Sequence, residues 1–329
     1  MFIKDAWDQM RDPFTGKRMG MVMNQDVTSL FYNKTAFDKA GVPFPNVDWT
    51  FADYEANAVA TTLKDADGKT TRWGGGLRGG LWWGWVYHIY GFGGQVRDEE
   101  TRLECLLGEP EALEGLEWLR RVMWDVNCFA RADQIAATGL PLQTFSGLPG
   151  GITCMAELST EAVGAMEQFA KDFDWEWNQT HYPKGPVTRS AQGLPDVRSI
   201  YAGVIKRGTQ EAAWEWVKFK CAEEWFQDEG ITKTCGRFPG LLASVAKWVT
   251  LLRELKPALQ NVHIETIPEA VDMGYLRGSP VFRDQRAAQE LIDPAIEAVL
   301  VTGEQPVSIF KDVAAAVTKQ QKELFAARD

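Results

Sequence analysis

The chain has 329 residues, of which 45% are hydrophobic and 24% are charged, the composition of an ordinary globular protein of about two domains. Its formal net charge of -10 argues against nucleic acid or an anionic membrane surface as a partner. Tryptophan is frequent, with 14 residues, and most of these rings are expected to pack in the core.

Metal and thiol chemistry have little support in the sequence. The five cysteines form no Cys-x-x-Cys pair and have no zinc-type spacing, and the three histidines are scattered. Most of the cysteines are therefore expected to be buried structural residues. No metal or cofactor is expected. The cysteines are Cys105, Cys128, Cys154, Cys221 and Cys235.

No hydrophobic run is long enough to cross a membrane. The first eight residues, Met1 to Asp8, are mixed and acidic, so they do not have the basic and then apolar pattern of a secretory signal. Residues 1–18 are predicted to be the end of a helix followed by a turn, and Met19 to Met23 is predicted to be a strand.

Local signals define the next elements well. A buried strand from Leu30 leads into a short helix that ends at Gly41. A second helix begins at Thr50, with Asp53 three residues later as the reciprocal partner of a capping box. Residues 65–69 then turn the chain back toward a strand.

An unusual group of aromatic rings follows a run of glycines. Trp82, Trp83 and Trp85 fall within four positions, in the segment Leu81-Trp-Trp-Gly-Trp-Val-Tyr87. Core packing is the ordinary role of tryptophan, but rings beside glycines have few neighbours that could cover them. Such rings would suit a cleft that binds a sugar.

The rest of the chain is predicted to alternate helices and short strands, and to be helical beyond Leu241. The predicted elements are a helix from Pro110, a strand at 150–155 with a loop at 156–160, a strand at 173–182, an exposed loop at 183–197, a strand at 198–204, a helix capped by Thr209, and a helix that begins at Asp293-Pro294 and stops at Gly303.

The order of these features resembles the extracellular solute-binding proteins of ABC importers, in the sugar-binding family 1 that includes maltose-binding protein. The stretch Leu30 to Asp53 matches the recurring LYYNKxLFxxAGxxxPxTWxE of that family, and Trp82 to Gly94 matches its aromatic segment ending in Gly-Gly. The resemblance extends over essentially the whole chain. Further matches are Gly151 to Met155, the Pro-Lys-Gly-Pro turn at 183–186, residues 212–219 and residues 236–239.

The resemblance implies an α/β fold of the periplasmic-binding-protein-like type II, with two lobes joined by a hinge. It assigns residues 1–26 and 199–237 to the first lobe, and residues 27–198 and 238–329 to the second. The opening βα units of the first lobe, and a signal peptide before them, have no match. The first lobe is therefore expected to be incomplete, through truncation, a misassigned start or a fragmentary sequence.

The function implied by the resemblance is that of a non-enzymatic, monomeric receptor. It would bind a carbohydrate between its lobes and deliver it to the permease subunits of an ABC importer. Members of the family work in the periplasm or outside the cell, in association with the membrane. The sequence itself does not distinguish a monosaccharide from an oligosaccharide or another polar solute.

The resemblance also nominates residues for the binding site. Asp26 matches a hinge carboxylate that would accept hydrogen bonds from sugar hydroxyls, although an Asx turn or a helix cap would explain it equally. Arg237, at the third crossover, would bond hydroxyls with its fork of donors or pair with an acid. Trp82, Trp83 and Trp85 would stack on sugar rings.

Other nominated residues lie on the second-lobe loop and on the return crossover. Glu157 stands where the family usually has a stacking tryptophan, and it would contact ligand or cap the helix near Thr160. Arg198, Ser199 and Tyr201 would face the ligand, although a half-exposed strand gives the same pattern.

Two other functions remain possible from the sequence. A glycosidase also combines aromatic platforms with two acids, and Asp26 with Glu157 is the one pair that can be nominated. A truncated, non-functional family remnant would instead leave sheet edges exposed and prone to association.

Overall fold

The computed structural model describes residues 1–12, 15–77, 82–137, 147–148, 150–172, 175–199 and 208–326, with the backbone alone for Asp5, residues 82–83 and residues 167–172. The chain divides into two compact units. Unit 1 comprises Met1–Ser29, Ser159–Lys171 and Ala191–Gly278, and unit 2 comprises Leu30–Leu158, Asp172–Ser190 and Ser279–Asp329.

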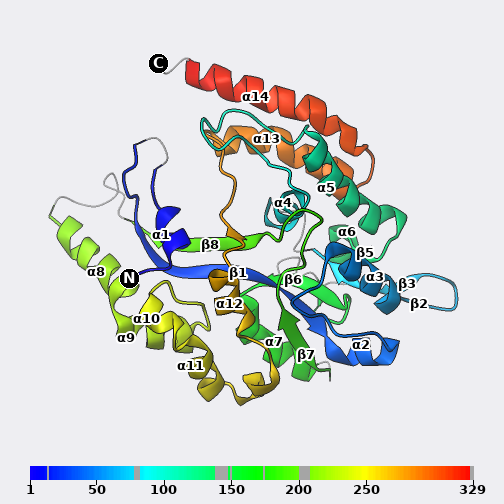
Figure 1. Ribbon diagram of the computed structural model, residues 1–329, viewed down its shortest axis with the longest axis horizontal. Helices are drawn as coiled ribbons and strands as arrows, with labels where there is room; N and C mark the ends of the chain where they lie inside the picture. The colour runs from blue at the N-terminus through cyan, green and yellow to red at the C-terminus, as the bar shows by residue number, and fades with distance from the viewer. Residues whose placement is uncertain are drawn as a thin grey trace. The chain divides into compact units, whose positions relative to one another are not determined.

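One long strand, β1 (Met21–Asn33), passes from unit 1 into unit 2 (Figure 1). Nearly all of its residues are buried, because neighbouring elements cover both of its faces. Its later half is rich in β-branched and aromatic residues, which suit such a strand. It belongs to a five-stranded sheet of order β6-β1-β8-β9, in which β7 also pairs with β1.

Within unit 1, β1 pairs antiparallel with β8 (Ala191–Arg198), so that Asn24 lies opposite Asp196. The strand β8 pairs in parallel with the short β9 (Leu276–Arg277). A hydrophobic cluster of Met23, Val217, Cys221 and Ile231 joins β1 to the helices that follow β8. The helical segments of unit 1 are α1 (Lys4–Asp8), α7 (Glu161–Asp172), α8 (Gln210–Ala222), α9 (Glu224–Phe226), the π-helix Gln227–Thr234, α10 (Leu242–Val245), α11 (Trp248–Leu255), the 3-10 helix Pro257–Asn261 and α12 (Thr266–Asp272).

Within unit 2, β1 pairs antiparallel with β7 (Trp177–Thr180), and the ring of Phe31 stacks on Trp177 with centroids 5.6 Å apart. The helices of unit 2 are α2 (Lys34–Ala40), α3 (Phe51–Thr61), α4 (Trp82–Gly91), α5 (Pro110–Arg120), α6 (Ala132–Ala136), α13 (Gln285–Ile296) and α14 (Phe310–Ala326), with π-helices at Arg121–Asp125 and Glu297–Val301 and a 3-10 helix at Val307–Ile309. Its short strands are β2 (Leu63–Lys64), β3 (Thr70–Arg72), β4 (Gly75–Gly76) and β5 (Phe129–Ala130).

The helix end at Gly41, the helix start at Thr50 and the turn at residues 65–69 are confirmed. Gly41 ends α2 in the left-handed conformation, with φ of 68°. The capping box at the start of α3 is present, because Thr50 accepts from the Asp53 amide and Asp53 accepts from the Thr50 amide. The turn at residues 65–69 leads into β3, which pairs antiparallel with β2.

Several predicted elements are wrong. Residues 191–198 are not an exposed loop but the strand β8, which pairs with β1 far away in the sequence. The strand predicted at 150–155 begins only at Met155, so that β6 (Met155–Ser159) covers most of the predicted loop. The helix α13 passes through Pro294 and begins instead after Asp284, whose carboxylate accepts from the Ala287 amide at 3.1 Å.

The boundaries of the two units also differ from those of the expected lobes. Residues 238–278, expected in the second lobe, belong to unit 1. There Trp248 packs edge to face on Phe238 with ring centroids 5.2 Å apart, and Lys256 donates to the Gly164 carbonyl at 2.7 Å. Among the described residues, no helix is both long and apolar enough to span a membrane.

Candidate functional site

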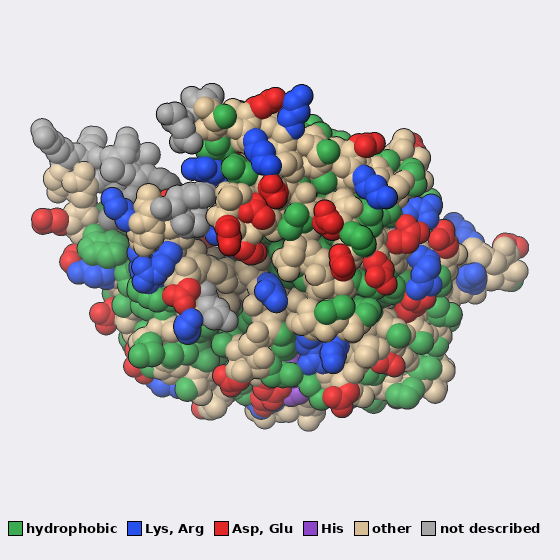
Figure 2. Space-filling model, turned by 45° about the horizontal axis from the view of Figure 1, so that its top comes forward, with side chains coloured by type: hydrophobic (Ala, Val, Ile, Leu, Met, Phe, Trp, Pro, Cys, Tyr) green, Lys and Arg blue, Asp and Glu red, His purple; other side chains and the backbone are tan. Residues whose placement is uncertain are grey.

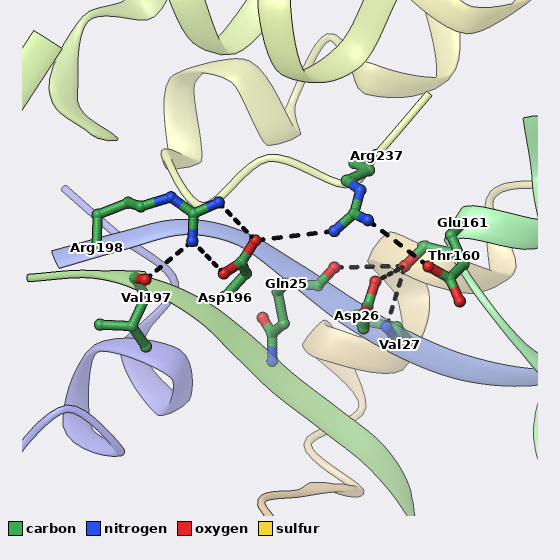
Figure 3. Close-up of polar contacts among 9 residues, drawn as sticks. All are labelled: Gln25, Asp26, Val27, Thr160, Glu161, Asp196, Val197, Arg198 and Arg237. Atoms are coloured by element: carbon green, nitrogen blue, oxygen red, sulfur yellow. Dashed lines mark hydrogen bonds and ion pairs between the residues drawn. The ribbon is translucent and has the colours of Figure 1, made fainter. Parts of the chain in front are cut away.

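In unit 1, the carboxylate of Asp26 is held in place by a threonine from a distant segment (Figure 3). The hydroxyl of Thr160 lies 3.2 Å from Asp26 Oδ1 and accepts from the Val27 amide at 3.2 Å. Thr160 is fully buried, whereas Asp26 is only partly buried. Asp26 lies inside β1, so it occupies neither an Asx turn nor a helix cap.

Arg237 lies beside the same group, between two acids of unit 1 (Figure 3). Its guanidinium nitrogens are 3.8 Å from Asp196 Oδ2 and 3.7 Å from Glu161 Oε2. Both contacts are ion pairs longer than a hydrogen bond. Asp196 is engaged more closely by Arg198, which approaches its two oxygens at 2.5 and 3.1 Å. Arg237 therefore keeps donors that these acids do not satisfy.

We call Asp26, Thr160, Glu161, Asp196 and Arg237 the Asp26–Arg237 cluster. Two of its members, Asp26 and Arg237, were nominated from the sequence, and the structure places both in unit 1. The side chain of Arg237 is 34% exposed. A partly exposed guanidinium next to a partly buried carboxylate offers both donors and acceptors to a ligand rich in hydroxyls.

Two polar residues of this region were not singled out from the sequence. Asn24 and Gln25 are fully buried, and within the described part of the chain the side-chain nitrogen and oxygen of each have no hydrogen-bond partner. An unsatisfied buried polar group costs about 1–3 kcal/mol. The sequence feature that could have indicated them is the pair of consecutive side-chain amides, Asn24 and Gln25, next to the apolar part of β1.

Glu157 lies elsewhere, in the interior of unit 2. It belongs to β6, and its side chain is 5% exposed. The Tyr182 hydroxyl donates to Glu157 Oε2 at 2.9 Å, and His88 Nε2 lies 3.0 Å from Oε1. Burial, together with the nearby Glu157 charge, raises the pKa of Tyr182 well above its ordinary value. Because α7 begins only at Glu161, Glu157 does not cap that helix.

The aromatic nominations fall in α4 of unit 2. Trp85 is 1% exposed and borders a cavity of about 20 Å³ together with Met123, Arg131 and Leu300. It is therefore a core residue of unit 2 in this structure. Trp82 and Trp83 form the start of α4, and their side chains lie outside the described part of the structure.

Ser199 and Tyr201 are not brought to the cluster by any described contact. Ser199 lines a groove of unit 1 with a volume of about 550 Å³, which also contains Trp7, Arg18 and Trp214. Asp26 and Arg237 are not among the residues that line this groove. Tyr201 lies outside the described residues.

No model of a protein family matches the chain, and no curated protein matches it either. Its fold is similar to that of the ABC substrate-binding protein Lmo0181 from Listeria monocytogenes in complex with cycloalternan. That match has a TM-score of 0.74 and 20% sequence identity, and it covers 99% of this chain and 76% of the other.

Two further solved structures are similar. The GacH receptor of Streptomyces glaucescens GLA.O matches with a TM-score of 0.71 and 20% identity, over 98% of this chain and 74% of the receptor. Maltose-bound MalE3 of T. maritima matches with a TM-score of 0.74 and 17% identity, over 98% of this chain and 76% of MalE3. At these identities the similarity shows the fold alone, and the predicted α/β fold class is confirmed.

Proposed function

We propose that this protein is the substrate-binding component of an ABC importer and that it binds a carbohydrate. The observation that carries the proposal is the Asp26–Arg237 cluster, where a positioned carboxylate and an incompletely satisfied guanidinium lie in one unit. Such groups make paired, charge-assisted hydrogen bonds with neighbouring hydroxyls, and these are stronger than neutral ones.

The proteins with a similar fold support this ligand class. Lmo0181 is bound to cycloalternan, the GacH receptor to acarbose, and MalE3 to maltose. They are binding proteins, and we propose the same non-enzymatic role for this chain. We further propose that it works outside the cytoplasm as a monomer and passes its ligand to a membrane-bound ABC permease.

We propose Asp26 and Arg237 as the polar contacts of the sugar, and the rings of Trp82 and Trp83 as its stacking platforms. An aromatic face is complementary to the apolar face of a pyranose ring. We also propose Ser199 and Tyr201 as residues that face the ligand. Trp85 and Glu157 have interior positions in unit 2, so we assign them no sugar contact.

The glycosidase alternative would need two convergent acids. Of the nominated pair, Glu157 is only 4% exposed, and its two oxygens have Tyr182 and His88 as close neighbours, so it is not accessible as a second catalytic acid. We therefore favour a receptor. Acidic and basic side chains are interspersed on the face shown in Figure 2, and the net charge of -10 supports a partner other than nucleic acid.

The test is a thermal-shift screen with mono- and oligosaccharides, combined with an assay for released reducing sugar. A sugar that binds only the native state adds about 2.7 kcal/mol of stability at 100 times its Kd, which raises the melting temperature. We expect a saturable rise with one sugar class and no release of reducing sugar. Sustained turnover of a glycan would contradict the receptor role, and no shift with any sugar would contradict the ligand class.

A further inference from the structure

Unit 1 contains a groove that the Asp26–Arg237 cluster does not line. The groove lies between α1, the start of β1 and α8, and its volume is about 550 Å³. Small-molecule pockets have volumes of about 300–1,000 Å³, so the groove has the size of a ligand site. Every lining residue that the structure describes belongs to unit 1, so the groove lies within one compact unit. We call it the Trp7–Trp214 groove.

A positioned cation lines this groove. The Arg18 guanidinium lies over the ring of Trp7, with Cζ 3.6 Å from the ring centroid, and it donates a hydrogen bond to the Trp7 carbonyl oxygen. The Trp7 ring also stacks on Phe2, with centroids 4.7 Å apart. Because an aromatic face already holds the guanidinium, little conformational freedom is lost when it binds a ligand.

Arg18 has no acid as a partner in the part of the chain that the structure describes. A backbone carbonyl satisfies one of its N–H donors, and no carboxylate lies within ion-pair distance. The charges that influence it from farther away are those of Arg11 and Asp8. Asp8 is engaged by Lys4 at 2.8 Å. The charge of Arg18 therefore lacks a direct counter-ion among the described residues.

The helix α8 contributes a second ring and a second cation. Trp214 and Lys218 are four residues apart, so they lie on the same face of α8, and both line the groove. Trp214 is 39% exposed, so much of its ring is uncovered. Lys218 pairs with Glu215 at 2.6 Å, but both side chains are exposed, and such a pair contributes at most about 1 kcal/mol. Lys218 can therefore turn toward an anion in the groove with little loss of stability.

The chemistry of the groove favours an anion attached to a ring. No carboxylate is found among its described lining residues, and the net charge of the chain is -10, so attraction of an anion has to come from these local cations. Guanidinium groups bind carboxylates and phosphates through paired hydrogen bonds, and aromatic faces pack on flat rings.

We propose that the Trp7–Trp214 groove is a second ligand site, which binds a small molecule that carries a carboxylate or phosphate group on a flat ring. The anion pairs with Arg18 and Lys218, and the ring packs on Trp214. This site does not depend on the proposed sugar function.

The site is tested by calorimetric titration of the full chain with probes that carry no sugar. Indole-3-acetate presents a carboxylate and phenyl phosphate presents a phosphate. Indole-3-acetamide is the neutral control, and inorganic phosphate is the control without a ring. We expect at least one anionic probe to bind with a Kd below about 1 mM, and the controls to bind at least about 10-fold more weakly. Binding by neither anionic probe, or equal binding by a control, would overturn the proposal.

Variants locate the probe in the groove. We expect Arg18→Gln to weaken binding roughly 10- to 150-fold, because a hydrogen bond to a charged group is lost. Trp214→Ala should weaken it roughly 2- to 12-fold, because one ring contact is lost. The matched control is Lys220→Gln, which removes a cation of α8 that does not line the groove and should leave the affinity unchanged.

Thermal unfolding shows which variants are folded. If Arg18→Gln is unfolded, Trp214→Ala decides alone, because it truncates a partly exposed ring. Wild-type affinity in every folded variant of the groove would overturn the assignment.

Competition separates the two sites. A sugar that binds the protein should leave the affinity for the anionic probe unchanged, and a probe that the sugar displaces would overturn the proposal of a second site. If the probe binds as expected but no sugar binds, the proposed function fails and the second site stands.

Discussion

Thr160 and Asp26 are 134 positions apart in the sequence, and their side-chain oxygens lie 3.2 Å apart in the structure. This contact joins the residue that follows β6 to the middle of β1, and both residues belong to unit 1. It fixes the carboxylate that we propose as a sugar ligand. Within the described part of the chain, the neighbouring Arg237 lies 3.7 and 3.8 Å from its two acids, beyond hydrogen-bond distance, so it has donors available for hydroxyls.

Replacing Thr160 by valine should weaken sugar binding and lower stability together. Valine has the same shape but cannot accept from the Val27 amide, which then loses its side-chain partner. An unsatisfied buried group costs about 1–3 kcal/mol. Unfolding in urea and sugar titration measure the two effects. Thr160→Ser keeps the hydroxyl and is the control; equal losses in both variants would show that the hydroxyl is unimportant.

Trp83→Ala should abolish sugar binding and leave the melting temperature nearly unchanged. A stacking platform contributes to the complex and little to the free protein. The measurement pairs calorimetric titration with thermal unfolding. A large loss of stability would instead identify Trp83 as a core residue.

Trp85→Ala, in contrast to Trp83→Ala, should lower the stability of the protein. Trp85 is 1% exposed in the core of unit 2, and truncation of a buried aromatic residue to alanine costs about 3–5 kcal/mol. We expect a clear fall in the free energy of unfolding of unit 2. A variant as stable as the wild type would contradict the interior position of this ring.

The stability that the ionised Asp98 carboxylate contributes should be lost in acid. Burial by itself would raise the pKa of the Asp98 carboxyl. The pKa is nevertheless lowered to about 2, because the carboxylate accepts hydrogen bonds from the amides of Glu104, Thr101 and Arg102 and from the Thr101 hydroxyl. A depressed pKa in the folded state contributes stability above the ordinary value of 3.8, and this stability is lost as the pH falls toward about 2.

The variant Asp98→Asn should therefore be less stable than the wild type at neutral pH, with the difference shrinking below about pH 4. Thermal unfolding as a function of pH measures it. The control is Asp272→Asn, since Asp272 is an exposed acid on α12. A difference between Asp98→Asn and the wild type that stays constant down to about pH 2 would contradict this explanation.

The sequence predicted best what depends on a few neighbouring residues. Gly41 and the Thr50–Asp53 capping box were found because each acts within one helical turn. The strand β8 was missed because its sequence contains glycine and proline, and it is a strand only through pairing with β1.

The candidate site shows the same limit. Asp26 and Arg237 were nominated through resemblance, but the contacts of Thr160, Glu161 and Asp196 with them come from distant parts of the chain. The Tyr182 hydroxyl contacts Glu157, which is 25 positions away in the sequence, and His88, which is 94 positions away. No local sequence pattern marks such contacts.

The most direct measurement is calorimetric titration of the wild type, Asp26→Asn and Arg237→Ala with the sugar that gives the largest thermal shift. A hydrogen bond to a charged group contributes about 1.5–3 kcal/mol, so each variant should bind roughly 10- to 150-fold more weakly. The exposed Arg286→Ala in unit 2 is the matched control and should bind as the wild type does. Wild-type affinity in both Asp26→Asn and Arg237→Ala would contradict the assignment of the sugar site to the Asp26–Arg237 cluster.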